Sequence, residues 1–276
     1  MERSSTDLAN RFRARHRGDG VLILPNAWDA GTARLMESLG AEAIATTSSG
    51  VAWAHGYPDG DALPITTYAE AVREIARVVS CPVSVDAEGG YSADPDEVRE
   101  HLLRLIDAGA VGFNLEDGHG PPALLCKKIE AARAAGQKAG VDVFINARTD
   151  VFLKGLAPGR ELEETLRRAA EYSSAGADGL FVPSCTSPAQ IEAIVRGQAL
   201  PLNVMARPTL PPLETLTRLG VRRLSAGGAI VQGAWAVAKR LASQFLAQGC
   251  TDGLFAETLA YLDGNALFTH ERGAGR

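Results

Sequence analysis

The chain contains little of the chemistry on which several large classes of protein depend. Its four cysteines, Cys81, Cys126, Cys185 and Cys250, form no CxxC pair, which argues against a zinc site or a disulfide framework and favours reduced thiols in a cytoplasmic protein. No apolar run approaches the roughly 18 residues of a membrane span, and the polar N-terminal segment lacks the apolar core of a signal peptide. The net charge of −5 disfavours nucleic acid and anionic membrane surfaces as partners.

Three motifs that would mark other enzyme classes are also absent. The first apolar run is followed by "PNAWDAGTAR", which has no GxGxxG fingerprint for a dinucleotide, and no GxSxG elbow occurs. A Schiff-base aldolase needs a lysine in the mouth of its active site, and no lysine ends a predicted strand. The lysines are Lys127, Lys128, Lys138, Lys154 and Lys239.

What the sequence does contain is an alternation of short apolar runs and longer helical segments. Eight runs lack strict polar alternation, which is typical of strands buried on both faces of a parallel sheet. They are "VLILPNA", "AEAIATTSS", "PVSVDAE", "AVGFNLED", "DVFINARTD", "DGLFVPS", "PLNVMA" and "VRRLSAGG". A helix is predicted over residues 66–79, and another starts with Asp94 at the N-cap and Pro95 in the first turn. A junction of helix end, glycine and strand recurs four times, as in "DAGAVGFNL".

Eight strands joined by helices predict a (β/α)8 TIM barrel, an α/β fold, as a single domain over residues 1–276. An open doubly wound sheet is the alternative, which the missing dinucleotide fingerprint disfavours. Residues 229–248 are expected to form the eighth helix, and residues 252–262 an extra helix within a C-terminal helical extension over 251–276. Such an extra helix packs on its own barrel or on a neighbour, which favours an oligomer.

Polar residues gather where the predicted strands end, which is where the active sites of such barrels lie. Asp86 and Glu88 lie at the end of the third run, and the fourth, fifth and seventh runs contribute Glu116, Arg148 and Asn203. Asp86 and Glu88 have the same parity, so they point to one face if the strand continues through both. Three acids in one mouth repel one another unless a cation compensates, and an all-oxygen cluster suits Mg2+ or Mn2+.

Two features of the same mouth suit an anionic ligand. The planar fork of Arg148 matches a carboxylate or phosphate, and the small-residue turn Ser48-Ser49-Gly50 offers backbone amides. The structural alternative for Arg148 is an ion pair with a neighbouring carboxylate, Asp150 or Glu116.

Other polar residues of this mouth also have structural alternatives. Asn203 could merely tether a loop, and Asp117 is expected to cap a turn rather than bind metal. His55 and His119 lie in loops at the active face, where a lone histidine is more often solvated than catalytic, so both are only candidates.

Five separated motifs occur in the order in which one enzyme superfamily carries them. "SVDAEGGY", "NLEDG", "INARTD" and "PLNVMA", with the frame "GAEAIATTSSGVAWAHGYPDG", resemble the strand ends of the isocitrate lyase/phosphoenolpyruvate mutase superfamily. The resemblance runs from about Asn26 to Gly228, nearly the whole barrel. It implies a homotetramer, a dimer of dimers, in which neighbouring barrels exchange their last helix.

The resemblance also implies the metal ligands. Mg2+ would bind through the position of Asp86, while three further carboxylates would hold metal-bound waters. These are Asp59, Glu88 and Glu116, of which Asp59 lies in the loop "GYPDGD", outside the strand ends.

The substrate positions follow in the same way. The carboxylate of a 2-oxo acid would bind at Ser48, Ser49 and Gly50. Arg148 would anchor the oxyanion side of the substrate, and Asn203 would line its distal part. Enzymes of this superfamily make or break a C–C or C–P bond next to a 2-oxo carboxylate, and the metal stabilises the enolate that forms.

Three motifs of the superfamily are missing. Isocitrate and methylisocitrate lyases carry a KKCGH-like loop with a cysteine acid after the fourth strand, where this chain reads "EDGHGPPALLC" and Cys126 falls in the next predicted helix. Those lyases show a glutamate after strand six, where this chain has Val182-Pro183-Ser184. The Lys-Thr/Ser-Asn gate of the mutases and phosphonopyruvate hydrolases is absent too. Tricarboxylate lyase activity is therefore disfavoured, and the short gate "GHGPP" is expected to leave the site more open.

Together these features predict a Mg2+-dependent lyase acting through a metal-stabilised enolate on a small 2-oxo or 2-hydroxy dicarboxylic acid, oxaloacetate-like or methylisocitrate-like. The reaction would be retro-Claisen or retro-aldol cleavage, or decarboxylation, with a metal-bound water or His119 as the candidate acid. The alternatives are a C–P enzyme of the phosphonopyruvate hydrolase or phosphoenolpyruvate mutase type, and a 2-oxo acid binding protein without turnover.

Overall fold

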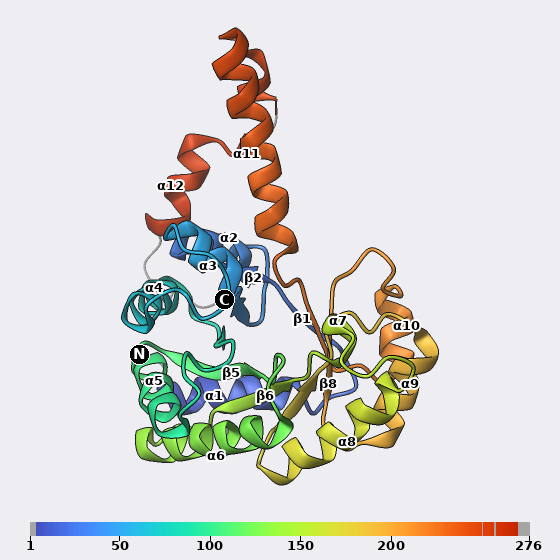
Figure 1. The fold of residues 1–276 in the computed structure, drawn as a ribbon. Coiled ribbons are helices and arrows are strands. Elements are labelled where there is room, and N and C mark those ends of the chain that lie inside the picture. The colour runs from blue at the N-terminus through green and yellow to red at the C-terminus, as the bar shows by residue number, and fades with distance from the viewer. Residues whose placement is uncertain (1–3, 250, 257, 270–276) are drawn as a thin grey trace.

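Nine short parallel strands form a barrel surrounded by helices (Figure 1). The strands are β1 Leu22–Leu24, β2 Asn26–Ala27, β3 Ile44–Thr46, β4 Val83–Asp86, β5 Ala110–Glu116, β6 Phe144–Arg148, β7 Gly179–Phe181, β8 Leu202–Met205 and β9 Arg223–Ser225. The computed structural model describes residues 4–249, 251–256 and 258–269. β1 and β2 flank Pro25 and together occupy one strand position of the barrel, because β1 pairs with β9 while β2 pairs with β3. The nine strands therefore occupy eight strand positions, which confirms the predicted (β/α)8 barrel.

Helices follow the strands, and one of them, α5, carries the end signals expected from the sequence. They are α1 Ser5–Arg15, α2 Ala30–Ser38, α3 Ser48–Ala54, α4 Ile65–Val78, α5 Pro95–Asp107, α6 Pro122–Ala139, α7 Val151–Lys154, α8 Glu161–Ser174, α9 Pro188–Gly197, α10 Leu213–Arg218, α11 Ala229–Gln248 and α12 Tyr261–Thr269. The side chain of Asp94 accepts the backbone N–H of Asp96 and caps α5, as predicted. Gly109 follows α5 with a φ of 110°, a conformation that favours glycine at this recurring junction.

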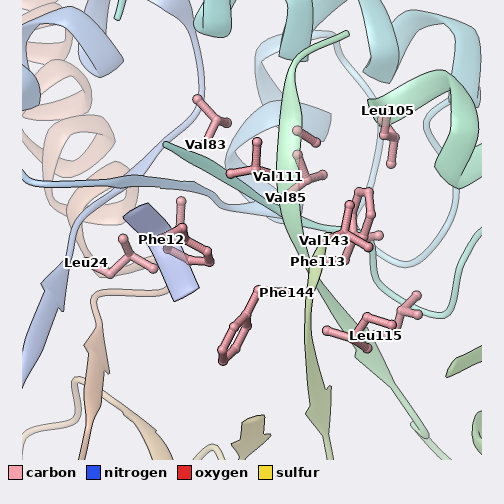
Figure 2. Packing of buried hydrophobic residues seen from close by; sticks show 14 of the residues in the cluster. Phe12, Leu24, Val83, Val85, Leu105, Val111, Phe113, Leu115, Val143 and Phe144 are labelled. Carbon is pink, nitrogen blue, oxygen red and sulfur yellow. The ribbon is translucent and has the colours of Figure 1, made fainter. Parts of the chain in front are cut away.

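Apolar side chains that point out of the barrel pack under the helices. Val85, Phe113 and Leu115 on β4 and β5 are fully buried, as is Leu105 of α5 (Figure 2). Each such side chain contributes about 1.5–3 kcal/mol relative to an exposed one. Residues of the opposite parity on the same strands point into the barrel, and these are the polar residues of the site.

The N-terminal helix α1 fills the end of the barrel where the strands begin. Phe12 packs edge to face on Phe144, the first residue of β6, with ring centroids 5.6 Å apart (Figure 2). His16 stacks on the same ring at 4.0 Å. A Cβ at Gly112 would lie 2.8 Å from Phe12 Cε1, so glycine leaves the room that this ring needs. Because this end is filled, a ligand reaches the barrel from the end where the strands finish.

The predicted eighth helix is present as α11, but it projects away from the barrel (Figure 1). Val231 near its start is buried, whereas Trp235 and Phe245 are 49% and 47% exposed. On the barrel itself, Ile23 of β1 faces outward and is 54% exposed, because α11 does not fold back over this part of the sheet. The exchange of this helix between subunits stays a prediction.

The helix predicted over residues 252–262 is wrong in position. Residues 252–255 form a single 3₁₀ turn, and the α-helix that follows is α12, which starts at residue 261. α12 returns to the barrel, where the carbonyl of Leu267 accepts a hydrogen bond from Arg34 Nε at 2.7 Å. Residues 270–276 of the predicted extension lie outside the described residues. Within the described ranges, no helix is long and apolar enough to cross a membrane.

Candidate active site

Strand register places the predicted site residues in successive layers inside the barrel. Asp86 pairs with Asn114, and Asn114 pairs with Asn146, which makes one layer across β4, β5 and β6. Two residues further along, Glu116 pairs with Arg148. Because side chains alternate with a period of two, this second pair points into the barrel above the first layer, at the ends of the strands.

Asp86 is held by neutral donors from its surroundings. Ser48 Oγ donates to Asp86 Oδ2 at 3.0 Å, and Asn114 Nδ2 donates to Oδ1 at 3.3 Å. The backbone N–H of Asp86 donates to Thr46 Oγ1, and its carbonyl accepts from the hydroxyl of Tyr68. These contacts orient the carboxylate without neutralising it, which suits a metal ligand.

Asp59 and Glu116 share the electrostatic field of Asp86. Desolvation raises the pKa of Asp59, and the charge of Asp86 adds to the rise, against a hydrogen bond from Ser48 and the charge of Arg148. Burial raises the pKa of Glu116 to about 8; Arg148 opposes this rise and Asp86 adds to it. Burial and the charge of Asp86 thus disfavour ionisation of both neighbouring carboxyl groups, and a bound cation would favour it.

Glu88 is placed by a turn and not by strand parity. β4 ends at Asp86, and Glu88 has a φ of 49°, so the condition that the strand continues through both residues is not met. Its carboxylate accepts the backbone N–H of Asp61 at 2.6 Å and the hydroxyl of Tyr91 at 2.8 Å. Asp61 and Tyr91 also have positive φ, of 56° and 61°, so three strained residues interlock at the rim.

This interlocked loop leaves Glu88 close to the other acids. Burial raises the pKa of Glu88 to about 7, and the charges of Asp61 and Asp86 add to the rise. Both carboxylate oxygens of Glu88 already accept protein hydrogen bonds. Its role in holding metal-bound water therefore stays a prediction.

Arg148 is bound on two sides, as its structural alternative predicted. Its Nη1 lies 2.5 Å from Glu116 Oε2, while Nε and Nη2 donate to the two carboxylate oxygens of Asp150 at 2.7 and 3.2 Å. A guanidinium has five N–H donors; the hydrogen bonds to Asp150 use two of them, and the ion pair with Glu116 engages Nη1. One N–H on each terminal nitrogen remains, which matches the paired donors that bind a carboxylate. The ion pairs and the predicted substrate contact are therefore compatible.

The first turn of α3 brings the predicted anion-binding residues to Asp86. Ser48, Ser49 and Gly50 begin this helix, so their backbone N–H groups lack intrahelical partners. Ser48 donates to Asp86 through its hydroxyl and its backbone N–H, and Ser49 Oγ lies 3.1 Å from Thr47 Oγ1. A Cβ at Gly50 would lie 2.7 Å from Thr47 Cγ2, so no larger residue fits the turn. Binding of a substrate carboxylate there stays a prediction.

Asn203 and Asp117 have structural partners. Asn203 is buried, and its Nδ2 donates to the carbonyl of Val204 at 2.6 Å, which fits the alternative of a tether. The turn cap expected at Asp117 is wrong among the described residues, because its carboxylate instead accepts from the backbone of Asp150 at 2.9 Å and from Arg168 at 2.7 Å. The predicted contact of Asn203 with the distal part of a substrate is not tested by this geometry.

His119 is exposed in the loop between β5 and α6. No hydrogen bond or ion pair joins it to Asp86, Glu116 or Arg148 within the described residues. Its role as the acid stays a prediction.

Lys128 lies next to the site, although it was not predicted there from the residues at the strand ends. It lies on α6, yet its side chain is 7% exposed and its Nζ donates to the carbonyl of Gly89, directly after Glu88. Burial lowers the pKa of Lys128, against the charges of Asp61 and Glu116. The available signal was a lysine on the apolar face of the helix "LLCKKIEAA", which is a buried position for a charge.

The residues at this mouth fit a divalent ion bound through one direct ligand. Among the described residues, no group of three or more His, Cys, Asp or Glu is arranged to hold a metal. Ser48 orients the carboxylate of Asp86, and the charge of Asp86 acts on Asp59 and Glu116. Mg2+ usually keeps several waters and takes one or two carboxylates, which matches this donor set.

The sequence model of the phosphoenolpyruvate phosphomutase family matches residues 12–246. The chain belongs to this family. An oxaloacetate decarboxylase from Bradyrhizobium sp. (strain BTAi1 / ATCC BAA-1182) is 30% identical to this family member over 226 residues, which cover 77% of each chain. These matches confirm the predicted membership of the isocitrate lyase/phosphoenolpyruvate mutase superfamily. They also confirm the predicted enzyme class, because the named relatives include carbon–carbon lyases.

Two solved structures from Burkholderia cenocepacia J2315 have the barrel of this family member. One, provisionally named a phosphonomutase, is 41% identical with a TM-score of 0.82, and the match covers 87% of this chain and 99% of the other. The second, provisionally named a lyase/mutase, is 33% identical with a TM-score of 0.88 and coverage of 96% and 97%.

Proposed function

We propose that this family member is a Mg2+-dependent carbon–carbon lyase that cleaves a small 2-oxo dicarboxylic acid, with oxaloacetate as the first compound to test. The observation that supports this most is the combination of mutually repelling carboxylates around Asp86 with two free N–H donors on Arg148. In such a site a cation would be bound by the carboxylates, and an anionic substrate would be bound by the cation and by Arg148. The decarboxylase at 30% identity supports the type of bond that breaks.

Each residue of the site has a separate proposed role that follows from its position. Bound Mg2+ would supply positive charge next to the keto and carboxylate oxygens, which stabilises an enolate. Asp86 would hold the ion directly, because Ser48 and Asn114 orient its carboxylate. Asp59 and Glu116 would hold water on the ion, and Arg148 would bind the substrate with the N–H groups that its ion pairs leave free.

The projecting α11 supports an assembly of several copies, which we propose to be the homotetramer implied by the resemblance. Trp235 and Phe245 are half-exposed on α11, while Ile23 is half-exposed on the barrel. Both surfaces would be covered if α11 packed on a neighbouring barrel, as large exposed apolar areas usually mark an interface.

A C–P enzyme is the second candidate. The provisionally named phosphonomutase at 41% identity supports it. A phosphonate would use the same cation and the same Arg148 donors, because both substrates carry an anionic group beside a keto acid. The site geometry therefore suits both reactions, and turnover decides between them.

A metal-dependent substrate panel tests the proposal. Oxaloacetate, substituted malates, methylisocitrate and phosphonopyruvate are each incubated with the protein, with Mg2+ or with a chelator. Pyruvate, oxalate, phosphoenolpyruvate and phosphate are measured. Because free Mg2+ itself promotes decarboxylation of oxaloacetate, the Asp86→Asn variant at equal metal concentration is the matched control. We expect Mg2+-dependent pyruvate formation above that control.

The other outcomes separate the alternatives. Conversion of phosphonopyruvate to pyruvate and phosphate, or to phosphoenolpyruvate, without cleavage of the carbon acids, would replace the lyase by a C–P enzyme. Tight binding of oxalate with no turnover of any compound would indicate a binding protein.

A further inference from the structure

Arg223 is a buried cation beneath the candidate active site. It begins β9, is 1% exposed, and its guanidinium lies 5.8 Å from the ring centroid of Phe12 at the filled end of the barrel. A charge removed from water in this way is costly unless hydrogen bonds or an opposite charge compensate. The contacts of Arg223 therefore indicate which group compensates its charge.

The guanidinium has few partners. Nη2 donates to Asn114 Oδ1 at 3.3 Å, whereas Nε and Nη1 have no hydrogen-bond partner among the described residues. Burial lowers the pKa of Arg223 to about 9, and the charge of Asp86 opposes this lowering. His16 offers no countercharge, because burial and the nearby Arg223 lower the pKa of His16 to about 3 and keep its ring neutral.

A single amide joins Arg223 to Asp86. Asn114 accepts from Arg223 through Oδ1 and donates to Asp86 Oδ1 through Nδ2, both at 3.3 Å. Asn146 fixes the orientation of this amide, because its Nδ2 donates to Asn114 Oδ1 at 2.9 Å. Asn203 Oδ1 accepts from the same Nδ2 of Asn146 at 3.0 Å. The buried cation is thus directed at the carboxylate from below, opposite the mouth.

We propose that Arg223 is a built-in countercharge of Asp86, which stabilises the metal-free site and weakens the binding of a divalent cation there. This inference rests on the metal site of the proposed function. The charge of Asp86 attracts Arg223 when the site holds no cation, and a divalent ion at Asp86 is repelled by Arg223. Arg223 therefore sets how readily the ion binds and leaves, while Asp86 still provides the ligand.

Direct titration with Mn2+, followed by electron paramagnetic resonance, tests this without any substrate. Arg223→Gln removes the charge and keeps a donor for Asn114, whereas Arg223→Lys keeps the charge. We expect Arg223→Gln to bind Mn2+ roughly tenfold more tightly than the unchanged protein, since a buried repulsion is removed. Arg223→Lys is expected to bind as the unchanged protein does.

A matched control and a second measurement separate charge from structure. Arg13→Gln removes a partly buried arginine that pairs with Asp178, and it should leave Mn2+ affinity unchanged. Mg2+ should raise the melting temperature of Arg223→Gln more than that of the unchanged protein, because tighter binding to the folded state stabilises it more. If Arg223→Gln does not fold, Arg223→Met is measured instead, since apolar replacements of buried charges are often tolerated.

Equal or weaker Mn2+ binding by the folded uncharged variant would overturn this inference alone, provided that the unchanged protein binds Mn2+. If the unchanged protein does not bind Mn2+, both this inference and the metal site of the proposed function fail.

Discussion

Arg148 Nη1 lies 2.5 Å from Glu116 Oε2, so the predicted substrate anchor and a predicted water-holding acid are partners of each other. Asp150 holds the other edge of the same guanidinium through Nε and Nη2. Breaking a buried pair of this kind leaves an uncompensated charge. Arg148 is therefore fixed in place before a substrate arrives, and the two N–H groups that remain define where a carboxylate can bind.

Arg148→Lys should lower kcat/KM by about 10²–10³-fold on whichever substrate the panel identifies. A lysine keeps the charge, but it cannot donate to Glu116, Asp150 and a substrate carboxylate in one fixed plane. Steady-state kinetics measure the loss, and oxalate titration in Mg2+ shows whether binding falls as well. Arg133→Lys, which changes an arginine paired with Asp178, is the matched control and should keep normal activity. Unaltered kinetics for Arg148→Lys would remove Arg148 from the substrate site.

Asp86→Asn should abolish measurable Mn2+ binding, because it removes the charge of the proposed direct ligand while keeping its shape. Asp59→Asn should weaken Mn2+ binding by about 10- to 100-fold, the usual cost of losing an outer partner. Asp94→Asn changes a helix-capping aspartate and should not alter Mn2+ binding. The three variants are compared by Mn2+ titration, and equal effects of Asp86→Asn and Asp59→Asn would contradict the division of roles.

The barrel could be predicted because its signals are local. Each strand is an apolar run of a few residues, and Asp94 and Gly109 mark helix ends through their own backbone preferences. Asp86, Glu116 and Arg148 could be predicted as well, since parallel strands bring their ends to one edge of the sheet. The location of these three residues depends only on their position in the repeat and not on the packing around them.

The rest of the site depends on contacts between distant segments. Asp59 lies in a loop and Lys128 on a helix, and only the fold brings them to Asp86 and Gly89. The turn at Glu88 is held by Asp61, 27 residues earlier, so strand parity could not place it. The direction of α11 is likewise not encoded in its own apolar residues, which would suit packing on either barrel.

Phe245→Glu should dissociate the proposed tetramer into smaller species. Phe245 is 47% exposed on the projecting α11, so a charge there costs little in a single copy but is costly if a second copy covers it. Light scattering coupled to size exclusion measures the mass. Leu39→Glu, which changes an 80% exposed leucine directly after α2, is the control and should leave the mass unchanged. A monomeric unchanged protein would contradict the assembly itself.

The stability of the fold should depend on pH through His16. Burial, together with the charge of Arg223, lowers the pKa of His16 from 6.5 to about 3 in the folded protein. Between these values the unfolded chain binds the proton and the folded chain does not, so stability rises with pH in this window. The contribution is complete above about pH 6.5 and is lost progressively as the pH falls toward 3.

His16→Phe should remove this dependence, because phenylalanine keeps the stacking on Phe144 but cannot be protonated. At pH 5 the unchanged protein should have lost about 2 kcal/mol of its free energy of unfolding through His16, and the variant should not show this loss. The hydrogen bond from His16 Nδ1 to the carbonyl of Phe12 is also removed, which lowers the variant's stability by a constant amount at all pH values above the window. Urea unfolding at pH 5 and pH 7.5 measures the difference, and His119→Asn, at an exposed histidine, should keep the slope of the unchanged protein. An equal slope in His16→Phe and the unchanged protein would show that another group carries the acid sensitivity.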